Sequence, residues 1–137
     1  MDGKTASVVT GLSYGQLNYL IRIIPTLLST PRENDRHARN FTYREVVLLR
    51  LARVLKNDHF RIQSIKQALE VVNENWRDDD PDSASVLIYS PKSKRFAWAT
   101  PAELELIKTE SAMSLLSKMP GNYYFIGAIA REMQRYF

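Results

Sequence analysis

Two segments decide the fold that this sequence predicts: TGLSYGQLNYLIR at residues 10–22 and FTYREVVLLRLARVLKN at residues 41–57. Near its start, each has a hydroxyl residue followed three positions later by Gln or Glu, which is the capping box that begins many helices. Each then repeats apolar residues at spacings of three and four, the pattern of a helix with a buried face. Between them lies STPRENDRHARN, residues 29–40, which is rich in arginine and turn-forming residues. We therefore predict two capped helices joined by a basic loop, the order of a helix-turn-helix with a wing.

A tight turn precedes the first of these helices. Lys4 to Thr10 is a short, weakly amphipathic stretch, and Gly11 after it suits a turn because glycine readily adopts positive φ. Leu12 is expected to anchor the turn in the core. Ser13 with Gln16 then forms the capping box of the next helix.

The helix that starts at Ser13 has two distinct faces. Its apolar face consists of Leu17, Leu20, Ile21 and Ile24. Its other face consists of Tyr14, Gly15, Asn18, Tyr19 and Arg22. Tyrosine, asparagine and arginine can hydrogen-bond base edges and phosphates, so this helix is our candidate for entering a major groove. The alternative is an ordinary amphipathic helix whose two tyrosines pack against neighbouring residues.

The basic segment between the helices is the candidate wing. Pro25 ends the preceding helix, and Thr26 to Phe41 is expected to form a loop or short hairpin with Asn34 and Asp35 at its turn. The basic residues of its tip are Arg32, Arg36, His37 and Arg39. A projecting basic hairpin can contact phosphates beside the groove that the helix occupies. The alternative is a solvated loop whose charges bind nothing specific.

The helix that begins at Thr42 carries a wide apolar stripe. Its members are Val47, Leu48, Leu51, Ala52, Val54 and Leu55. Arg44 lies in the first turn, where the helix dipole disfavours a cation, so we assign its side chain to a phosphate contact. Residues 57–60 interrupt this helix, and a further helix is predicted from Ile62 to Trp76.

This order of parts resembles the MerR family of transcription regulators. TGLSYGQLNYL is similar to that family's turn and recognition helix, RNFTYREVVLLRLARVLKN to its wing arginine, aromatic residue and next helix, and HFRIQSIKQAL to the start of its last helix. The similarity covers about residues 5–75. The groove-facing residues that the resemblance implies are Tyr14, Gly15, Gln16, Asn18 and Tyr19. It also implies that Arg39 is the wing residue on the DNA backbone.

Several positions depart from the family pattern. Asn18 stands where the family usually has arginine, Phe41 where it has tyrosine, and His59 where glycine is common. After Trp76 the chain continues as RDDDPDSAS rather than as the long helix that usually pairs two subunits. Clustered aspartate with proline and serine predicts an acidic linker at residues 77–85. The cluster lacks the glycine and the terminal glutamate of a calcium loop, so we predict no metal there.

Residues 86–137 are predicted to form a small α+β unit, a β-hairpin plus two helices. SVLIYS and RFAWAT, joined by PKSK, make the hairpin, and a helix follows from Thr100 to Pro120. The residues expected to supply at least one buried face of the hairpin are Val86, Ile88, Phe96 and Trp98. The last segment, NYYFIGAIAREMQRYF, is predicted to be an amphipathic helix. Its aligned apolar residues are Phe125, Ile126, Ile129, Met133 and Phe137.

The predicted fold is therefore mainly α, with a winged helix-turn-helix domain at residues 1–76 joined by the linker to the unit at residues 86–137. Such a small unit has too little interior to bury its apolar residues alone. It should dock on the first domain or on a second copy, and because the usual pairing helix is missing we expect it to supply the dimer contact.

Composition narrows the function. A hydrophobic content of 45% with 25% charged residues is ordinary for a globular protein, and the absence of cysteine excludes disulfides and thiolate metal or redox sensing. No apolar run suggests a membrane span or signal peptide, so a cytoplasmic, nucleoid-associated location is expected. The net charge is +4, and residues 1–61 hold ten Lys or Arg against five Asp or Glu. Such a local positive field suits a polyanionic partner.

We predict a sequence-specific double-stranded DNA-binding transcription regulator. It should act as a homodimer, because one recognition helix and wing cover only a few base pairs. The candidate DNA-binding residues are Ser13, Tyr14, Gly15, Gln16, Asn18, Tyr19, Arg22, Arg32, Arg36, His37, Arg39 and Arg44.

The sequence also bears on enzyme activity, effector binding and alternative functions. The two histidines, His37 and His59, lack a suggestively spaced acidic partner, and no phosphate loop, nucleophile elbow or metal motif is present. We therefore predict no enzyme activity and no cofactor. A small-molecule or protein effector is compatible with the sequence, and its pocket would be expected in the aromatic C-terminal unit. The alternatives are a small architectural or excision factor, and an adaptor or antitoxin-like module. The adaptor would hold a protein through Tyr19, Trp98, Tyr123 and Tyr124.

Overall fold

The structure is a computed structural model that describes residues 1–24, 40–77, 85–100, 102 and 123–137. The predicted wing tip, most of the acidic linker and the helix expected before the last segment lie outside these residues. Within them the fold is mainly helical with a small antiparallel sheet, which confirms the predicted class. No helix in this part of the chain is long and apolar enough to span a lipid bilayer.

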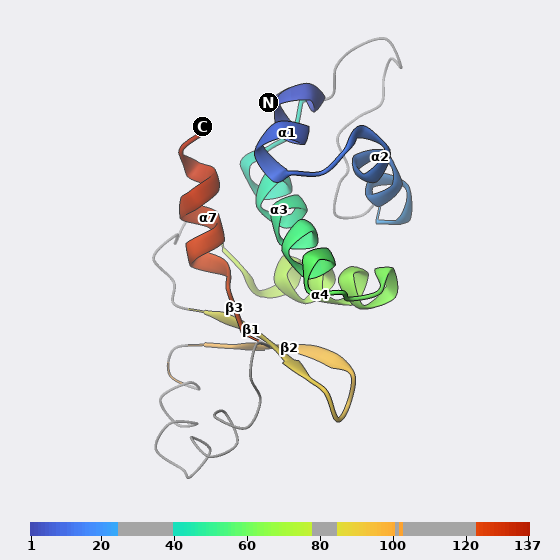
Figure 1. Ribbon diagram of the computed structural model, residues 1–137. Helices are drawn as coiled ribbons and strands as arrows, with labels where there is room; N and C mark the ends of the chain where they lie inside the picture. Colours follow the sequence, from blue (N-terminus) through green and yellow to red (C-terminus); the bar gives the residue numbers. More distant parts are fainter. Residues whose placement is uncertain (25–39, 78–84, 101, 103–122) are drawn as a thin grey trace.

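Helix α3, Tyr43–Asn57, lies at the centre of the fold (Figure 1). Its capping box forms as predicted: the backbone N–H of Glu45 donates to Thr42 Oγ1 at 3.2 Å, and that of Thr42 donates to Glu45 Oε1 at 3.1 Å. Burial extends beyond the predicted stripe to Val46 and Leu49. Helices from both ends of the chain pack around α3, so it needs apolar side chains on more than one face.

The chain reaches α3 through two shorter helices, α1 at Gly3–Thr10 and α2 at Tyr14–Ile23. Gly11 between them has a φ of 81°, as expected for a helix C-terminus that ends in the left-handed conformation. Leu12 follows with 2% of its surface exposed, so it does anchor the turn in the core. At the start of α1, the N–H of Thr5 donates to the carboxylate of Asp2 at 2.7 Å and lowers the pKa of that carboxyl group.

A tight turn joins α3 to α4, Ile62–Asn75. His59 in this turn has a φ of 68°, in the left-handed region that favours glycine. The backbone therefore keeps a glycine conformation at the position where the family commonly has glycine. Asp58 accepts a 2.5 Å hydrogen bond from the hydroxyl of Tyr124. Burial of that phenol, followed by its bond to Asp58 and the nearby carboxylate charge, raises the pKa of Tyr124 above its usual value.

The predicted hairpin is confirmed as strands β1, Val86–Ser90, and β2, Arg95–Ala99. A third strand, β3 at Tyr123–Phe125, pairs antiparallel with the other edge of β1 and gives the order β2-β1-β3. The last segment was predicted to be one helix, but its first residues form this strand. Tyrosine and phenylalanine favour extended backbone, and β1 offers them an open edge.

The register of the sheet divides the residues predicted to be buried between its two faces. Leu87 pairs with Trp98 and Tyr89 with Phe96, and residues opposite each other in an antiparallel sheet project from the same face. Leu87, which is fully buried, therefore shares the core side with Phe96 and Trp98. Val86 and Ile88 project from the other face, where Val86 is buried as predicted and Ile88 is partly buried. Alternation alone could not reveal which set would meet the helices.

Helix α4 covers the core side of the sheet and also engages its edge. The side-chain amide of Gln67 donates to the carbonyl of Phe96 at 3.1 Å and accepts from the N–H of Phe96 at 2.8 Å. Phe60, in the turn before α4, packs its ring against those of Tyr89 and Phe96 with centroids 4.8 and 5.1 Å apart. The hairpin is therefore held on α4 by aromatic packing and by a side chain that mimics a neighbouring strand.

The chain ends in α7, Ile126–Gln134, which packs along α3 on the side opposite α2 (Figure 1). Ile126 and Met133 are buried as predicted, whereas Phe125 and Phe137 are more than half exposed. One hydrophobic core contains residues of α1 to α4, the sheet and α7. The C-terminal unit thus docks on the first domain of its own chain, one of the two arrangements expected from its size.

Candidate nucleic-acid interface

The polar face of α2 is held in place by local hydrogen bonds at its start. The N–H of Gln16 donates to Ser13 Oγ at 3.2 Å, and the side chain of Gln16 accepts from the N–H of Ser13 at 2.9 Å. The predicted capping box is therefore complete. It satisfies two backbone donors of the first turn and fixes the direction in which α2 leaves the turn.

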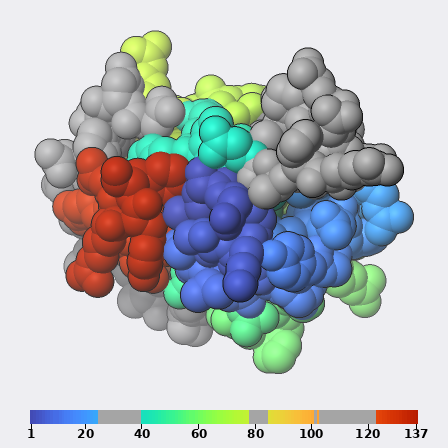
Figure 2. Space-filling view, turned by 90° about the horizontal axis from the view of Figure 1, so that it is seen from above, coloured from blue at the N-terminus to red at the C-terminus, as the bar shows by residue number. Residues whose placement is uncertain are grey.

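The candidate side chains of α2 lie on the protein surface. Leu17, Leu20 and Ile21 are buried on the inner side. The exposed residues of the outer side are Ser13, Tyr14, Gly15, Asn18, Tyr19 and Arg22, and Gln16 is partly exposed. Tyr14 and Tyr19 expose 54% and 43% of their surface, so part of each ring is open to solvent. Figure 2 shows α2 at the surface directly beside α1.

Two side chains on this face are paired with each other. The guanidinium carbon of Arg22 lies 5.9 Å from the ring centroid of Tyr19, one helical turn away. A cation over an aromatic face is attracted to it, and the contact limits the rotamers of both side chains. The pair presents a positive charge and a phenol hydroxyl together on the exposed side of α2.

The predicted wing residues Arg32, Arg36, His37 and Arg39 lie outside the described residues. The structure does show where their segment is attached. The described chain stops at Ile24, at the end of α2, and resumes at Asn40, next to Phe41, whose N–H donates to the carbonyl of Met1 at 2.6 Å. Phe41 itself is buried. Both attachment points therefore lie in the α1–α2 part of the molecule.

Arg44 has a different role from the predicted phosphate contact. Its guanidinium donates to Asn73 Oδ1 at 3.1 Å, to the carbonyl of Asn73 at 2.7 Å and to the carbonyl of Trp76 at 3.0 Å. It also lies 5.0 Å from the ring centroid of Trp76. These carbonyls lie at the end of α4, where they lack partners within the helix and where a cation is favourable. Arg44 thus joins the start of α3 to the end of α4.

A second arginine of α3 is engaged in the same way. Arg50 donates to the carbonyl of Thr10 at 3.2 Å and lies 3.4 Å from the carboxylate of Glu132 on α7. It therefore connects α1, α3 and α7 within the protein. The positive charge counted for residues 1–61 includes the arginines of α3. At Arg44 and Arg50 this charge holds helices of the protein together.

A pocket that the sequence did not predict lies behind the candidate interface. It has a volume of about 220 Å³ and lies between α2, α3 and the beginning of α4. The lining residues are Leu12, Gln16, Tyr19, Leu20, Ala52, Lys56, Phe60, Ile62 and Ile65. An effector pocket was expected in the C-terminal unit. This one draws its lining from three helices and their turns, a combination that no single stretch of sequence displays.

Comparison with known proteins agrees with this architecture. A family model described as the MerR HTH family regulatory protein matches residues 1–71, just over half of the chain. The chain belongs to this family, whose helix-turn-helix domains are DNA-binding regulators. The match begins before α1 and ends within α4, so it includes the exposed face of α2 and the turn at His59. No curated protein matches the chain.

Proposed function

We propose that this chain is a sequence-specific double-stranded DNA-binding transcription regulator that acts as a homodimer. Helix α2 enters the major groove with Tyr14, Gln16, Asn18 and Tyr19 toward the bases. Arg22 and the basic segment at residues 25–39 contact the phosphates. Arg44 is left out of this interface because its guanidinium already binds the end of α4.

The exposed polar face of α2 is the observation that carries the proposal. An asparagine amide can donate to and accept from one adenine edge at the same time, and tyrosine hydroxyls and arginine serve as phosphate contacts. The capping box and the buried Leu17 and Leu20 hold this face rigidly against α3. A rigid helix that presents such groups loses little entropy when it enters a groove, which favours specific binding.

Selection of bound duplexes from a random library tests the proposal. Asn18→Ala should cost about 1 to 3 kcal/mol on the selected sequence and relax the preference at one base pair. Gln63→Ala is the matched control, since Gln63 is an exposed amide that belongs to α4 and not to α2. Arg39→Ala should weaken all sequences alike and reduce the salt dependence by about one phosphate. Equal behaviour of Asn18→Ala and Gln63→Ala would remove α2 as the reading helix.

The homodimer part of the proposal needs its own measurement. Residues 85–137 contribute to the core of their own chain, so cutting the protein at Trp76 would remove part of that core and would not be a fair test. Among its described residues, the large apolar side chains that this part leaves exposed are Phe125, Tyr136 and Phe137. Sedimentation equilibrium on the full chain should show a dimer that Phe125→Ser or Tyr136→Ser weakens. A monomer at micromolar concentration would contradict the dimer.

Some of the residues that an adaptor would use to contact a protein partner are buried or partly buried. Tyr124 is 6% exposed and its hydroxyl is bonded to Asp58, while Trp98 is partly buried on the core side of the sheet. Tyr19 is the clearly exposed member of that set. Titration with random duplex DNA separates the two functions, because a DNA-binding protein shows affinity that falls steeply with salt. An adaptor shows no binding even at low salt.

A further inference from the structure

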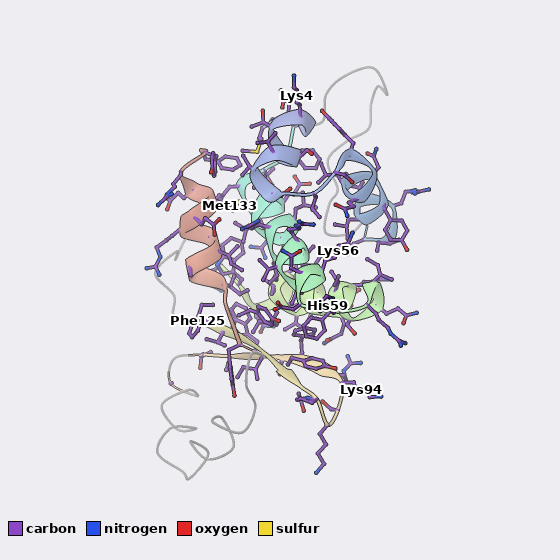
Figure 3. The ribbon with its side chains drawn as sticks, viewed as in Figure 1. Lys4, Lys56, His59, Lys94, Phe125 and Met133 are labelled. Atoms are coloured by element: carbon purple, nitrogen blue, oxygen red, sulfur yellow. The ribbon has the colours of Figure 1, made fainter. Side chains whose placement is uncertain are left out.

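The pocket behind α2 has the character of a small-molecule site. Six of its nine lining residues are apolar, and its polar atoms come from Gln16, Tyr19 and Lys56. Lys56 is the charged residue among them and lies near the C-terminal end of α3 (Figure 3). Its ammonium makes no hydrogen bond or ion pair with the residues that the structure describes. An apolar wall beside one unpaired cation is complementary to an apolar anion.

We infer that this pocket binds a small aromatic carboxylate, with the ring against the apolar wall and the carboxylate at Lys56. A cavity of about 150 Å³ lined by Leu, Ile and Phe holds a benzene molecule. A pocket of about 220 Å³ therefore has room for one ring and a short acid side chain. Phe60 and Tyr19 supply aromatic surface for the ring, and an ammonium–carboxylate contact is among the stronger hydrogen bonds.

The site is placed to influence DNA binding, a step that rests on the proposed function. Gln16 and Tyr19 belong both to the pocket lining and to the candidate reading face of α2. A bound carboxylate cancels the positive charge of Lys56 and so weakens the attraction that this part of the surface exerts on phosphates. Ligand and DNA therefore weaken each other's binding by the same factor.

Ligand binding is tested first on the full chain without DNA. The probes are phenylacetate and its neutral analogue phenylacetamide. Binding of each probe is measured by calorimetry and by NMR of methyl groups. Phenylacetate should bind with a dissociation constant of about 1 mM or tighter, the range for a ten-atom ligand. The methyl signals of Leu12, Leu20 and Ile65 should shift. The amide should bind about tenfold more weakly, because it lacks the charge-assisted bond to Lys56.

Two substitutions test the charge. Lys56→Met keeps most of the apolar stem and should remove the preference for phenylacetate over phenylacetamide. Lys66→Met is the matched control, because Lys66 is exposed on α4 and does not line the pocket. It should leave both affinities unchanged. A preference that survives Lys56→Met, or one that Lys66→Met abolishes equally, would overturn the assignment of Lys56.

Filling the pocket tests its location. Ala52 is 2% exposed in the wall, and Ala52→Leu should abolish binding of both probes. If that variant does not fold, nuclear Overhauser contacts between the phenylacetate ring and the methyl groups of Ile65 in the unaltered protein give the same information. Absence of binding up to about 10 mM, or ring contacts only with residues outside the pocket, would refute the inference.

Binding to a selected duplex is then measured with and without phenylacetate. A saturating amount should weaken DNA binding about tenfold, a typical coupling between two sites. A protein that binds DNA but not phenylacetate contradicts the ligand site alone. A protein that binds phenylacetate but no DNA contradicts the proposed function alone. Unchanged DNA affinity on the liganded protein contradicts the coupling between them.

Discussion

Replacing Arg44 by alanine should destabilise the protein without a direct effect on DNA binding. Its guanidinium makes three hydrogen bonds of 2.7 to 3.1 Å at the end of α4 and stacks on Trp76. A hydrogen bond from a charged group contributes about 1.5 to 3 kcal/mol when removed singly, and a cation–π contact adds about 0.5 to 1 kcal/mol. The three bonds share one side chain, are partly solvated and are not additive. We expect a loss of about 2 to 3 kcal/mol in the free energy of unfolding.

Urea unfolding followed by circular dichroism measures this loss. The midpoint should fall while the slope with denaturant stays unchanged. Arg61→Ala is the control, because Arg61 is exposed and makes no side-chain cap to α4, and its effect should stay within about 0.5 kcal/mol. Arg44→Ala should bind the selected duplex within about twofold of the unaltered protein. Unchanged stability together with weakened DNA binding would restore the phosphate contact and refute the structural role.

Three further changes have definite expected outcomes. His59→Gly should raise the free energy of unfolding by about 0.5 to 1 kcal/mol, measured in urea, because φ is 68° there. Met133→Ala should lower it by about 2 to 4 kcal/mol, since that side chain is 1% exposed between α7 and α3. The raised pKa of Tyr124 means that the folded state holds its proton more tightly than the unfolded state. Its contribution to stability is present below pH 10 and is lost as the pH rises above that value. Tyr124→Phe should flatten this alkaline loss in a pH series of unfolding curves, and a loss as steep as in the unaltered protein would contradict the assignment.

The starts of the helices could be predicted because the interactions that set them are local. Each capping box joins two residues three positions apart, Ser13 with Gln16 and Thr42 with Glu45. Their side chains bond backbone N–H groups that have no partner within the new helix. Gly11 likewise indicates the turn between α1 and α2, because glycine readily adopts the left-handed conformation that ends a helix. Such signals need no knowledge of the rest of the fold.

Features that depend on distant partners could not be predicted in this way. The dipole rule correctly marked Arg44 as unfavourable in its own helix, but its partners are about thirty residues further along the chain, at the end of α4. The hairpin was located correctly, but the sequence did not show that Leu87 would share the core side of the sheet with Phe96 and Trp98, while Val86 would be buried on the opposite face. The pocket that Lys56 lines exists only once three elements have assembled.

The helix that would read DNA depends on residues made about a hundred positions later. One side of α3 packs against α1, which in turn packs against α2, and α7 packs against α3 as well, with the hydroxyl of Tyr43 donating to the carbonyl of Ala130 at 2.8 Å. A nascent chain that stops before Ile126 leaves the part of α3 that α7 covers in water, at a cost comparable to the whole stability of a small domain. A chain truncated before α7 should therefore hold the exposed face of α2 on a less stable scaffold.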